Sequence, residues 1–305
     1  MAFRKVFSSS LTDKGIRKIF VQTTDGKNIS CRKCHGARII WVGEKRFRCK
    51  KCWSFGSLTA GTFLDGNRLS LRFWYELVWN FVLSHSANKT GKLLGKSPKT
   101  CWQGYQFIRW ILVQKSADDR KKITGTVEVD ESFFGGAFKN LRKKTRWEYR
   151  RLGLAKKGRG AALRKQPVFG IFKRNGSVYL ELLAEVTGVE LEEIIDRKIK
   201  KKTTVYSDKF TGYDGLVGLG YIHGSVDHGM EIYVEGSVHV NGMEGFWGLS
   251  KTNMHTYKGI KKKNWVYYLK EMEFRYNHRK LSFEEMTLNI IRILMSHRTS
   301  SFVPY

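Results

Sequence analysis

The sequence is short of proline, of acidic residues and of long apolar runs. Only three prolines occur among 305 residues, so no proline-rich linker divides the chain, and domain boundaries must be inferred from changes of pattern. No apolar run approaches the roughly 20 residues that a membrane-spanning helix needs, and the start of the chain lacks the apolar stretch of a secretory signal. We therefore expect an intracellular protein with no membrane partner.

Acidic residues are strongly outnumbered by basic ones. The 56 Lys and Arg against 27 Asp and Glu give a formal net charge of +29. Such an excess predicts a large polyanionic partner, because each phosphate that a protein neutralises releases condensed counterions. Nucleic acid is the natural candidate, with ribosomal-type scaffolding or a merely basic protein as the alternatives. The charge indicates the partner and leaves the chemistry open.

The five cysteines are few, and four of them form two pairs with two residues inside each pair and fourteen between the pairs. Four thiolates at this spacing are typical of a closed, tetrahedral structural zinc site. An iron–sulfur centre is the alternative, but the basic and aromatic residues between the pairs suit DNA contact. His35 could replace a ligand, although four cysteines already fill the site, and Cys101 is expected to be a buried apolar residue. The expected zinc ligands are Cys31, Cys34, Cys49 and Cys52.

Changes of pattern divide the chain into four segments. In the second, apolar residues recur at helical spacing from Leu71 to Val82, and a short helix, a turn and a longer helix follow. Such a helix-turn-helix could place Lys99, Gln103 and Arg109, expected to be exposed, in a DNA groove; an ordinary helical linker is the alternative. The expected domains are a zinc ribbon (1–60), a helical DNA-binding module (61–120), a catalytic domain (121–282) with a basic insertion (135–166), and a helical tail of unclear purpose (283–305).

The third segment alternates strands with a helix. Strands in hairpin order, then a helix that crosses to a further strand, predict a mixed sheet with flanking helices, an α/β fold. Helical patterns near 239–251 and 264–280 would cover the sheet. The expected strands are residues 125–134, 167–176, 178–187, 203–210 and 221–228, with the helix at 191–202.

Three acids are placed where a phosphodiester-cleaving enzyme needs them. Asp130 ends the apolar alternation of TVEVD and Asp208 closes TTVYSD, so both are expected at strand ends. Glu244 follows Asp208 with thirty-five residues between them, on a helical segment. Phosphodiester chemistry with two metal ions uses a few carboxylates from separate elements, because Mg²⁺ keeps several of its waters. Lys251 lies two helical turns beyond Glu244, on the same face.

Structural roles for these acids are also possible. The two aspartates could be turn formers at strand ends, and Asp214 and Asp227 are nearby rivals. Asn241 and Glu244 have the spacing of a helix-capping box, which would leave Glu244 without charge for a metal.

The basic insertion lies between the first two acids. Residues 139–165 hold twelve Lys or Arg and one Glu. This composition favours a segment that clamps DNA, with Trp147 and Tyr149 available to stack on bases; a solvated basic loop is the alternative. The basic residues expected to contact DNA are Arg142, Lys143, Lys144 and Arg146.

Over roughly residues 25–280 the chain resembles the DDE transposases of insertion sequences, within the zinc-ribbon, ISXO-two-like group (insertion-sequence family fifteen-ninety-five). The resemblance is carried by the paired cysteines, SLTAGTFLDGNRLSLRFWYELVW, VEVDESFFGG, VYSDKFTGYDGL, HVNGMEGFWGLSK and FRYNHRK. It implies a ribonuclease-H-like fold in which Asp130, Asp208 and Glu244 bind metal and Lys251 touches the transposon end; relatives use either type of residue, Asn or Glu, as third ligand. The glycines in HVNGMEGFWGLSK depart from a good helix sequence, since each costs roughly 1 kcal/mol relative to alanine.

The resemblance implies a transposase that acts on DNA inside the cell. It would bind the terminal inverted repeats, free a 3′-hydroxyl and join it to target DNA, with two Mg²⁺ or Mn²⁺ ions and structural zinc as cofactors. Its partners would be double-stranded DNA of the transposon ends and target, and further copies of itself as a homodimer or higher assembly on paired ends. A catalytically silent DNA-binding regulator, or a metal-dependent nuclease that does not join strands, remains the alternative.

Overall fold

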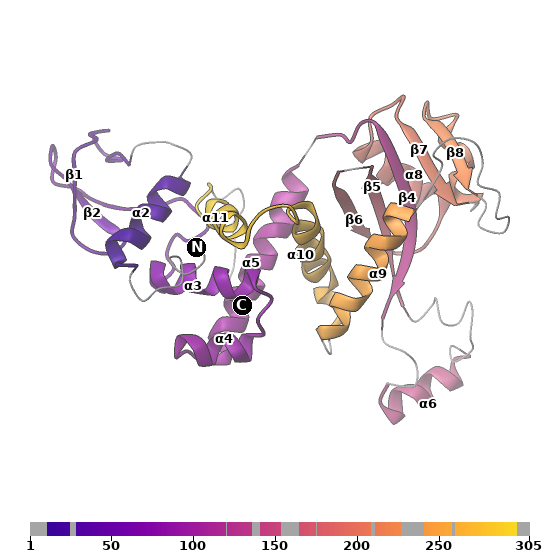
Figure 1. Cartoon of the computed structure of the whole chain (residues 1–305), viewed down its shortest axis with the longest axis horizontal. Helices are drawn as coiled ribbons and strands as arrows, with labels where there is room; N and C mark the ends of the chain where they lie inside the picture. Colours follow the sequence, from indigo (N-terminus) through magenta and orange to yellow (C-terminus); the bar gives the residue numbers. More distant parts are fainter. Residues whose placement is uncertain are drawn as a thin grey trace. The chain divides into compact units, whose positions relative to one another are not determined.

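The computed structural model divides into two compact units, Met1–Ile111 with His278–Tyr305, and Leu112–Asn277 (Figure 1). None of the helices in the described part of the chain is long and apolar enough to cross a membrane. The residues that the structure describes are 11–24, 29–119, 121–135, 141–153, 165–174, 176–208, 211–226, 241–257 and 260–297.

In the described residues of the first unit, helix α2 (Asp13–Thr23) is followed by a small sheet of strands β1 (Ile39–Trp41), β2 (Arg46–Cys49) and β3 (Phe55–Ser57). Both strand pairs are antiparallel, in the order β1-β2-β3. The first cysteine pair precedes β1, and in the second pair Cys49 ends β2 and Cys52 ends the turn before β3. The module has the layout expected of a zinc ribbon.

Helix α3 (Leu71–Val82) is the centre of the first unit, with ten of its twelve residues buried. It contacts α2, α4 (Ala87–Leu94) and α11 (Phe283–Leu294). The predicted short helix, turn and longer helix are α4, a turn at Gly95 with φ +60°, and α5 (Pro98–Asp118). The C-terminal helix, whose purpose the sequence did not indicate, therefore packs on α2 and α3 and completes this unit.

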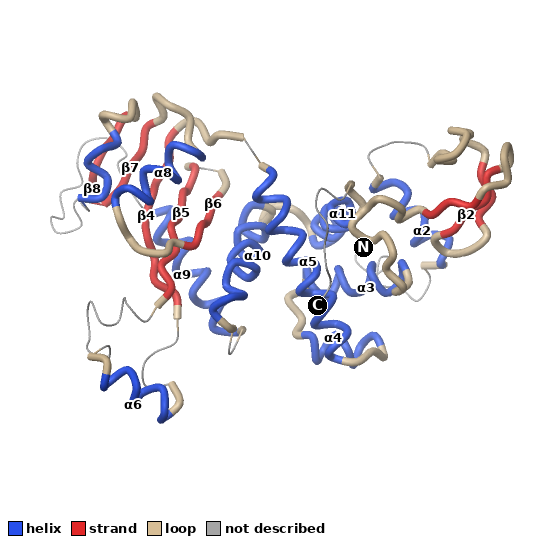
Figure 2. The backbone as a smooth tube through the Cα atoms, turned by 180° about the vertical axis from the view of Figure 1, so that it is seen from behind, coloured by secondary structure: helices blue, strands red, loops and turns tan. Residues whose placement is uncertain are grey.

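The second unit is built on a five-stranded mixed sheet in the order β6-β5-β4-β7-β8. Strand β4 pairs antiparallel with β5 and parallel with β7, and β8 is parallel to β7. Figure 2 shows these strands side by side with helices on both faces. The predicted mixed sheet with flanking helices is confirmed. The strands are β4 (Thr126–Phe134), β5 (Gln166–Lys173), β6 (Val178–Leu182), β7 (Thr204–Asp208) and β8 (Ile222–Val226).

Two apolar cores lie on the two faces of this sheet. Helix α8 (Gly188–Lys198) packs on one face against Val127 and Val129 of β4. Helices α9 (Asn241–Thr256) and α10 (Trp265–Asn277) cover the other face, where Phe134, Val168 and Phe172 meet them (Figure 1). The alternation of β4 therefore sends its even-numbered side chains toward α9.

Side chains of helix α10 also form hydrogen bonds with the backbone of the edge strand β6. The Asn277 side chain accepts a hydrogen bond from Val178 N–H (2.8 Å) and donates one to Val178 C=O (2.9 Å). Buried Glu273 accepts the N–H of Leu180 (2.8 Å) and is itself bonded by Lys270 (2.6 Å). Because an unpaired strand edge exposes backbone donors and acceptors, these contacts close the edge of the sheet.

Candidate active site and metal centre

Asp130 lies in the middle of β4 and not at the strand end that the sequence predicted, on the sheet face that α9 covers. Val127 and Val129 point into the opposite core, so alternation turns Asp130 toward the helix. The indole N–H of Trp247 donates a hydrogen bond to its Oδ2 (2.9 Å), and the backbone N–H of Glu131 donates one to its Oδ1 (2.8 Å). Two donors hold this carboxylate in one orientation.

Asp208 is the last residue of β7, the strand that runs parallel to β4. The pairing ends with Glu128 beside Tyr206, and the same register continued by two residues would bring Asp130 level with Asp208, whose charge acts on Asp130. Neighbouring strands lie about 4.8 Å apart, and side chains in register point to the same face. The two aspartates, which are far apart in the sequence, therefore come together on adjacent strands.

Glu244 is exposed in the first turn of α9, a turn that is anchored to β4 on both sides of it. The N–H of Met243 donates a hydrogen bond to Oε2 of Glu128 (3.1 Å), and the indole of Trp247 reaches the same strand. Arg174 holds the other carboxylate oxygen of buried Glu128 at 3.0 Å. This anchoring fixes where α9 presents Glu244.

The charges of Asp208 and Glu244 act on Asp130. Burial raises the pKa of Asp130 to about 6, and the negative charges of Asp208 and Glu244 contribute to that rise against the lowering effect of the Trp247 hydrogen bond. A cation among the three carboxylates would relieve this repulsion. Among the described residues, the group of metal-ligating side chains that comes together most closely is the four paired cysteines. An open carboxylate site suits Mg²⁺, which keeps several waters.

A fourth acid, Glu131, was missed by the sequence analysis. It accepts a hydrogen bond from the hydroxyl of Tyr213, which is fully buried. Burial raises the pKa of Glu131 to about 7, and the charges of Asp130 and Asp208 add to the effect. Its position beside Asp130 in the sequence was visible, but the tyrosine that contacts it comes from a segment more than eighty residues later.

Glycines allow α9 to approach the sheet. Gly170 on β5 is paired with Asp130, and a Cβ there would collide with the Met243 side chain and the Trp247 ring. A Cβ at Gly242 would collide with the ring of Phe172. Packing thus accounts for Gly242, one of the glycines that weaken this helix, whereas nothing in the structure explains Gly245 and Gly248.

Replacement of Gly170 by alanine tests this close approach. We expect Gly170→Ala to lower the free energy of unfolding by about 1–3 kcal/mol, because the added methyl group overpacks the contact between β5 and α9. Urea denaturation measures the change. The control is Gly245→Ala on the open side of α9, which should be neutral or stabilise by up to about 1 kcal/mol. Equal effects of the two substitutions would contradict the role given to Gly170.

The rival residues are placed differently. Asp214 is exposed in the short helix η2 (Thr211–Leu216), and its charge acts on His223. Asp227 lies outside the described residues, as does the side chain of Asn241, so the capping-box alternative for Glu244 stays open. Lys251 is exposed on α9, two turns beyond Glu244.

The four paired cysteines form the second cluster. The Sγ atoms of Cys31 and Cys52, and those of Cys34 and Cys49, lie 3.5 Å apart, and all four are within 4.8 Å of one another. Four thiolates around zinc at about 2.3 Å stand about 3.8 Å from each other in a tetrahedron, so the donor set and spacing fit this ion. The cluster fits a zinc ribbon, and His35 is not part of it.

Ser54 was not singled out from the sequence. Its hydroxyl lies 3.1 Å from the Sγ of Cys31 and 3.0 Å from that of Cys52. Hydrogen bonding from Ser54 lowers the pKa of both thiols, that of Cys31 to about 6. Such an outer hydrogen bond orients a thiolate ligand.

Loss of one thiol tests the cluster. We expect Cys49→Ser to abolish stoichiometric zinc and unfold the ribbon, because so small a module cannot bury enough apolar surface unaided. Elemental analysis and protease sensitivity of the ribbon measure the two effects. Cys101→Ala, at the buried cysteine of α5, is the control and should keep the metal. Purified protein that holds no zinc, or holds iron, would overturn the interpretation.

Of the three residues of α5 that were expected to contact DNA, two are exposed and one is buried. Lys99 and Gln103 on α5 are exposed. Arg109 is buried, only 4% exposed, with its guanidinium against the rings of Phe81 (5.6 Å) and Tyr105 (5.9 Å). The expectation that Arg109 is exposed was wrong, because aromatic residues of α3 and α5 enclose it.

The basic insertion contains a helix, α6 (Lys143–Arg151), with none of its residues buried. Arg142 precedes the helix, and Lys143, Lys144 and Arg146 belong to its first turns. Trp147 is 60% exposed, beneath the guanidinium of Arg151 at 5.4 Å. Residues 136–140 and 154–164 of the insertion lie outside the described part of the chain.

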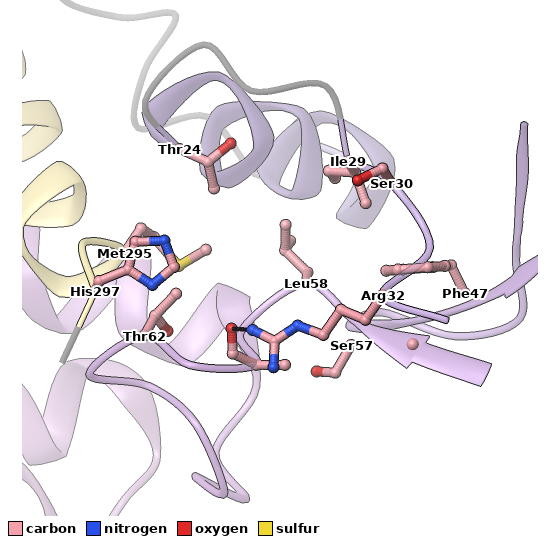
Figure 3. A pocket seen from close by; sticks show the side chains of 12 residues that line it. Thr24, Ile29, Ser30, Arg32, Phe47, Ser57, Leu58, Thr62, Met295 and His297 are labelled. Atoms are coloured by element: carbon pink, nitrogen blue, oxygen red, sulfur yellow. Dashed lines mark hydrogen bonds between the residues drawn. The ribbon is translucent and has the colours of Figure 1, made fainter. Parts of the chain in front are cut away.

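A cavity of about 170 Å³ lies in the first unit and involves neither cluster (Figure 3). Phe47 of β2 reaches it from the ribbon, and Met295 and His297 reach it from the segment after α11. Arg32 at its edge donates a hydrogen bond to the carbonyl of Ala60 (2.6 Å).

Comparison with known proteins matches the second unit to one family. A family model for the ISXO2-like transposase domain covers residues 122–277, which is half of the chain and contains all three acids. The chain is 25% identical over 274 residues to a protein in transposable element ISH50 of Halobacterium salinarum, covering 87% of this chain and 91% of that protein. It is 33% identical over 101 residues to a transposase-like protein of Haemophilus influenzae, covering 33% of this chain and 81% of that protein. The chain therefore belongs to the ISXO2-like transposase family.

Proposed function

We propose that the protein is a DDE transposase that binds the terminal inverted repeats of its element, cleaves a strand at each end and joins the freed 3′-hydroxyl to target DNA. The observation that carries the proposal is that Asp130 and Asp208 lie on adjacent parallel strands and that the charges of Asp208 and Glu244 both act on Asp130. The strand order, with three antiparallel strands followed by two parallel ones, supports the ribonuclease-H-like fold of such enzymes.

The three acids would hold two Mg²⁺ or Mn²⁺ ions, which activate the attacking oxygen and stabilise the leaving oxygen when bound. The chain's own contribution is to orient the carboxylates. The hydrogen bond from Trp247 joins one oxygen of Asp130 to α9, and Glu244 would reach the same site from the first turn of that helix. Lys251, further along α9, supplies a positive charge for the phosphate backbone of the transposon end.

We assign the third ligand to Glu244 rather than Asn241. Its charge acts on Asp130, so the carboxylate lies within electrostatic reach of the first acid. A third anion also neutralises two divalent ions better than a neutral amide does. Relative to the wild type, Glu244→Gln should keep the fold and lose cleavage.

DNA would be held by three parts of the chain. The ribbon, with structural zinc, and the helical module with Lys99 would bind the ends, and the basic insertion would clamp the DNA near the acids. Strand β4 supports the last assignment, because it continues beyond Asp130 toward its C-terminal end and leads directly into the insertion. Two ends require two active sites, so we propose a homodimer or higher assembly on paired ends.

Asp208→Asn tests the catalytic assignment. The substitution keeps the side-chain shape and removes the charge that holds a divalent ion, so cleavage of a labelled transposon end in Mg²⁺ should fall to background while end binding stays within twofold. Asp214→Asn, at the exposed rival, is the matched control and should cleave as the wild type does.

The same assay with a separate target plasmid separates the alternatives. A transposase joins the cut end to the plasmid, a nuclease cuts without joining, and a silent regulator binds without cutting. Retained cleavage by Asp208→Asn in either Mg²⁺ or Mn²⁺ would refute the assignment.

Replacement of Arg142, Lys143, Lys144 and Arg146 by alanine tests the insertion. The slope of log affinity against log salt should become shallower by about one unit for each phosphate that the variant no longer neutralises. The control removes four exposed lysines elsewhere, Lys14, Lys18, Lys121 and Lys200, and so makes the same change in net charge. An unchanged slope in the first variant, or an equal change in both, would make α6 a solvated basic segment.

A further inference from the structure

The two faces of the ribbon sheet differ in what covers them. On one face Trp41 and Phe47 pack edge to face, 5.7 Å between ring centroids, and Arg17 of α2 lies over Trp41 at 4.6 Å. Phe47 is buried and reaches the cavity of the first unit (Figure 3). This face is the inner face of the module.

The other face carries exposed apolar and aromatic side chains. The register places Ile40, Arg48 and Phe55 side by side across the three strands. Arg46 is two residues before Arg48 and so shares its face. Trp53 is 55% exposed and Phe55 is 59% exposed, although large apolar side chains are usually buried. We call Ile40, Arg46, Arg48, Trp53 and Phe55 the ribbon platform.

Guanidinium groups cover parts of these rings. Arg48 lies 4.7 Å from the ring centroid of Trp53 and 5.5 Å from that of Phe55, and Arg46 lies 5.0 Å from that of Phe55. In the described part of the chain, no ion pair joins either arginine to an acid. The platform is therefore cationic as well as aromatic.

Trp53 occupies a backbone position that favours glycine. It follows the second cysteine of the second pair and has φ +59°, and His35 has φ +55° at the equivalent position of the first pair. A bulky side chain is strained in this left-handed region, so the turn would form more easily with glycine. Its ring is not buried in either core. Within the ribbon the ring meets the guanidinium of Arg48, and more than half of the residue stays exposed.

We propose that the ribbon platform stacks the unpaired bases of single-stranded DNA, an inference that rests on the proposed function and adds a substrate form to it. Aromatic faces stack on bases whose own faces are open, and those of a duplex are covered by their neighbours. A duplex groove or backbone would use the arginines and leave the exposed rings unexplained. Cationic groups beside the rings neutralise the phosphates of the same strand.

The experiment compares single- and double-stranded DNA with the full-length protein, without Mg²⁺ and without chelator. Anisotropy of labelled oligothymidylate, about 20 nucleotides long, and of its duplex with oligoadenylate gives the two affinities. Trp53→Gly should weaken single-strand binding by at least about fivefold, with duplex binding within twofold and zinc content unchanged. Phe55→Ala should act in the same direction.

His35→Gly is the matched control, since it relieves the same backbone strain in the same module and removes no platform ring. It should leave both affinities unchanged. Wild-type single-strand affinity in both Trp53→Gly and Phe55→Ala would overturn the proposal, as would an equal loss on both DNA forms. Unchanged DNA affinities with altered self-association would assign the platform to a protein contact and would also overturn it. The readout involves no cleavage, so a failure of the three acids as metal ligands would not affect it.

Discussion

The contact of α9 with β4 and β5 is the interaction on which the candidate site depends. The two aspartates are set by the register of parallel strands, but Glu244 comes from a helix and reaches them only if that helix lies close to the sheet. Gly170 makes the approach possible, and the hydrogen bonds from Trp247 and Met243 to acids of β4 fix its register. The close packing of α9 on the sheet therefore determines where Glu244 lies relative to the two aspartates.

Asp130 lies at the same contact and is unusual in a chain of net charge +29. An acid in such a chain could pair with one of many cations, as Glu128 does with Arg174. Asp130 instead accepts a hydrogen bond from the Trp247 indole, and burial together with the charges of Asp208 and Glu244 raises its pKa to about 6. Carboxylates brought close together repel one another, and a cation bound among them lowers that cost. Divalent ions, which the transposase family implies, are the natural source of that compensation.

Periodicity and spacing predicted most of the fold because both depend on neighbours in the sequence. They gave the strand and helix order of the second unit, the short and long helices of the module, and the spacing of the four cysteines. Periodicity and spacing failed where a residue's environment is set by residues far away in the sequence. Arg109 has a place on a helical pattern that is compatible with exposure, yet Phe81 of α3 covers it. Tyr213 on Glu131, and the packing of α11 on α2 and α3, depend likewise on tertiary contacts.

Some residues of this chain are unfavourable for the secondary structure in which they lie. Where packing explains such a residue, its role is in folding; where packing does not, a functional role is indicated. Gly170 and Gly242 weaken a strand and a helix, and both are explained by side chains that would otherwise collide with them. Trp53 opposes its left-handed backbone, and it remains 55% exposed although the guanidinium of Arg48 lies over its ring. Natural sequences are otherwise consistent between local preference and fold, so a strained and exposed aromatic residue favours a partner outside the chain. A cationic, aromatic surface on a DNA-associated enzyme limits what that partner is, because open rings beside arginines match exposed bases and phosphates together.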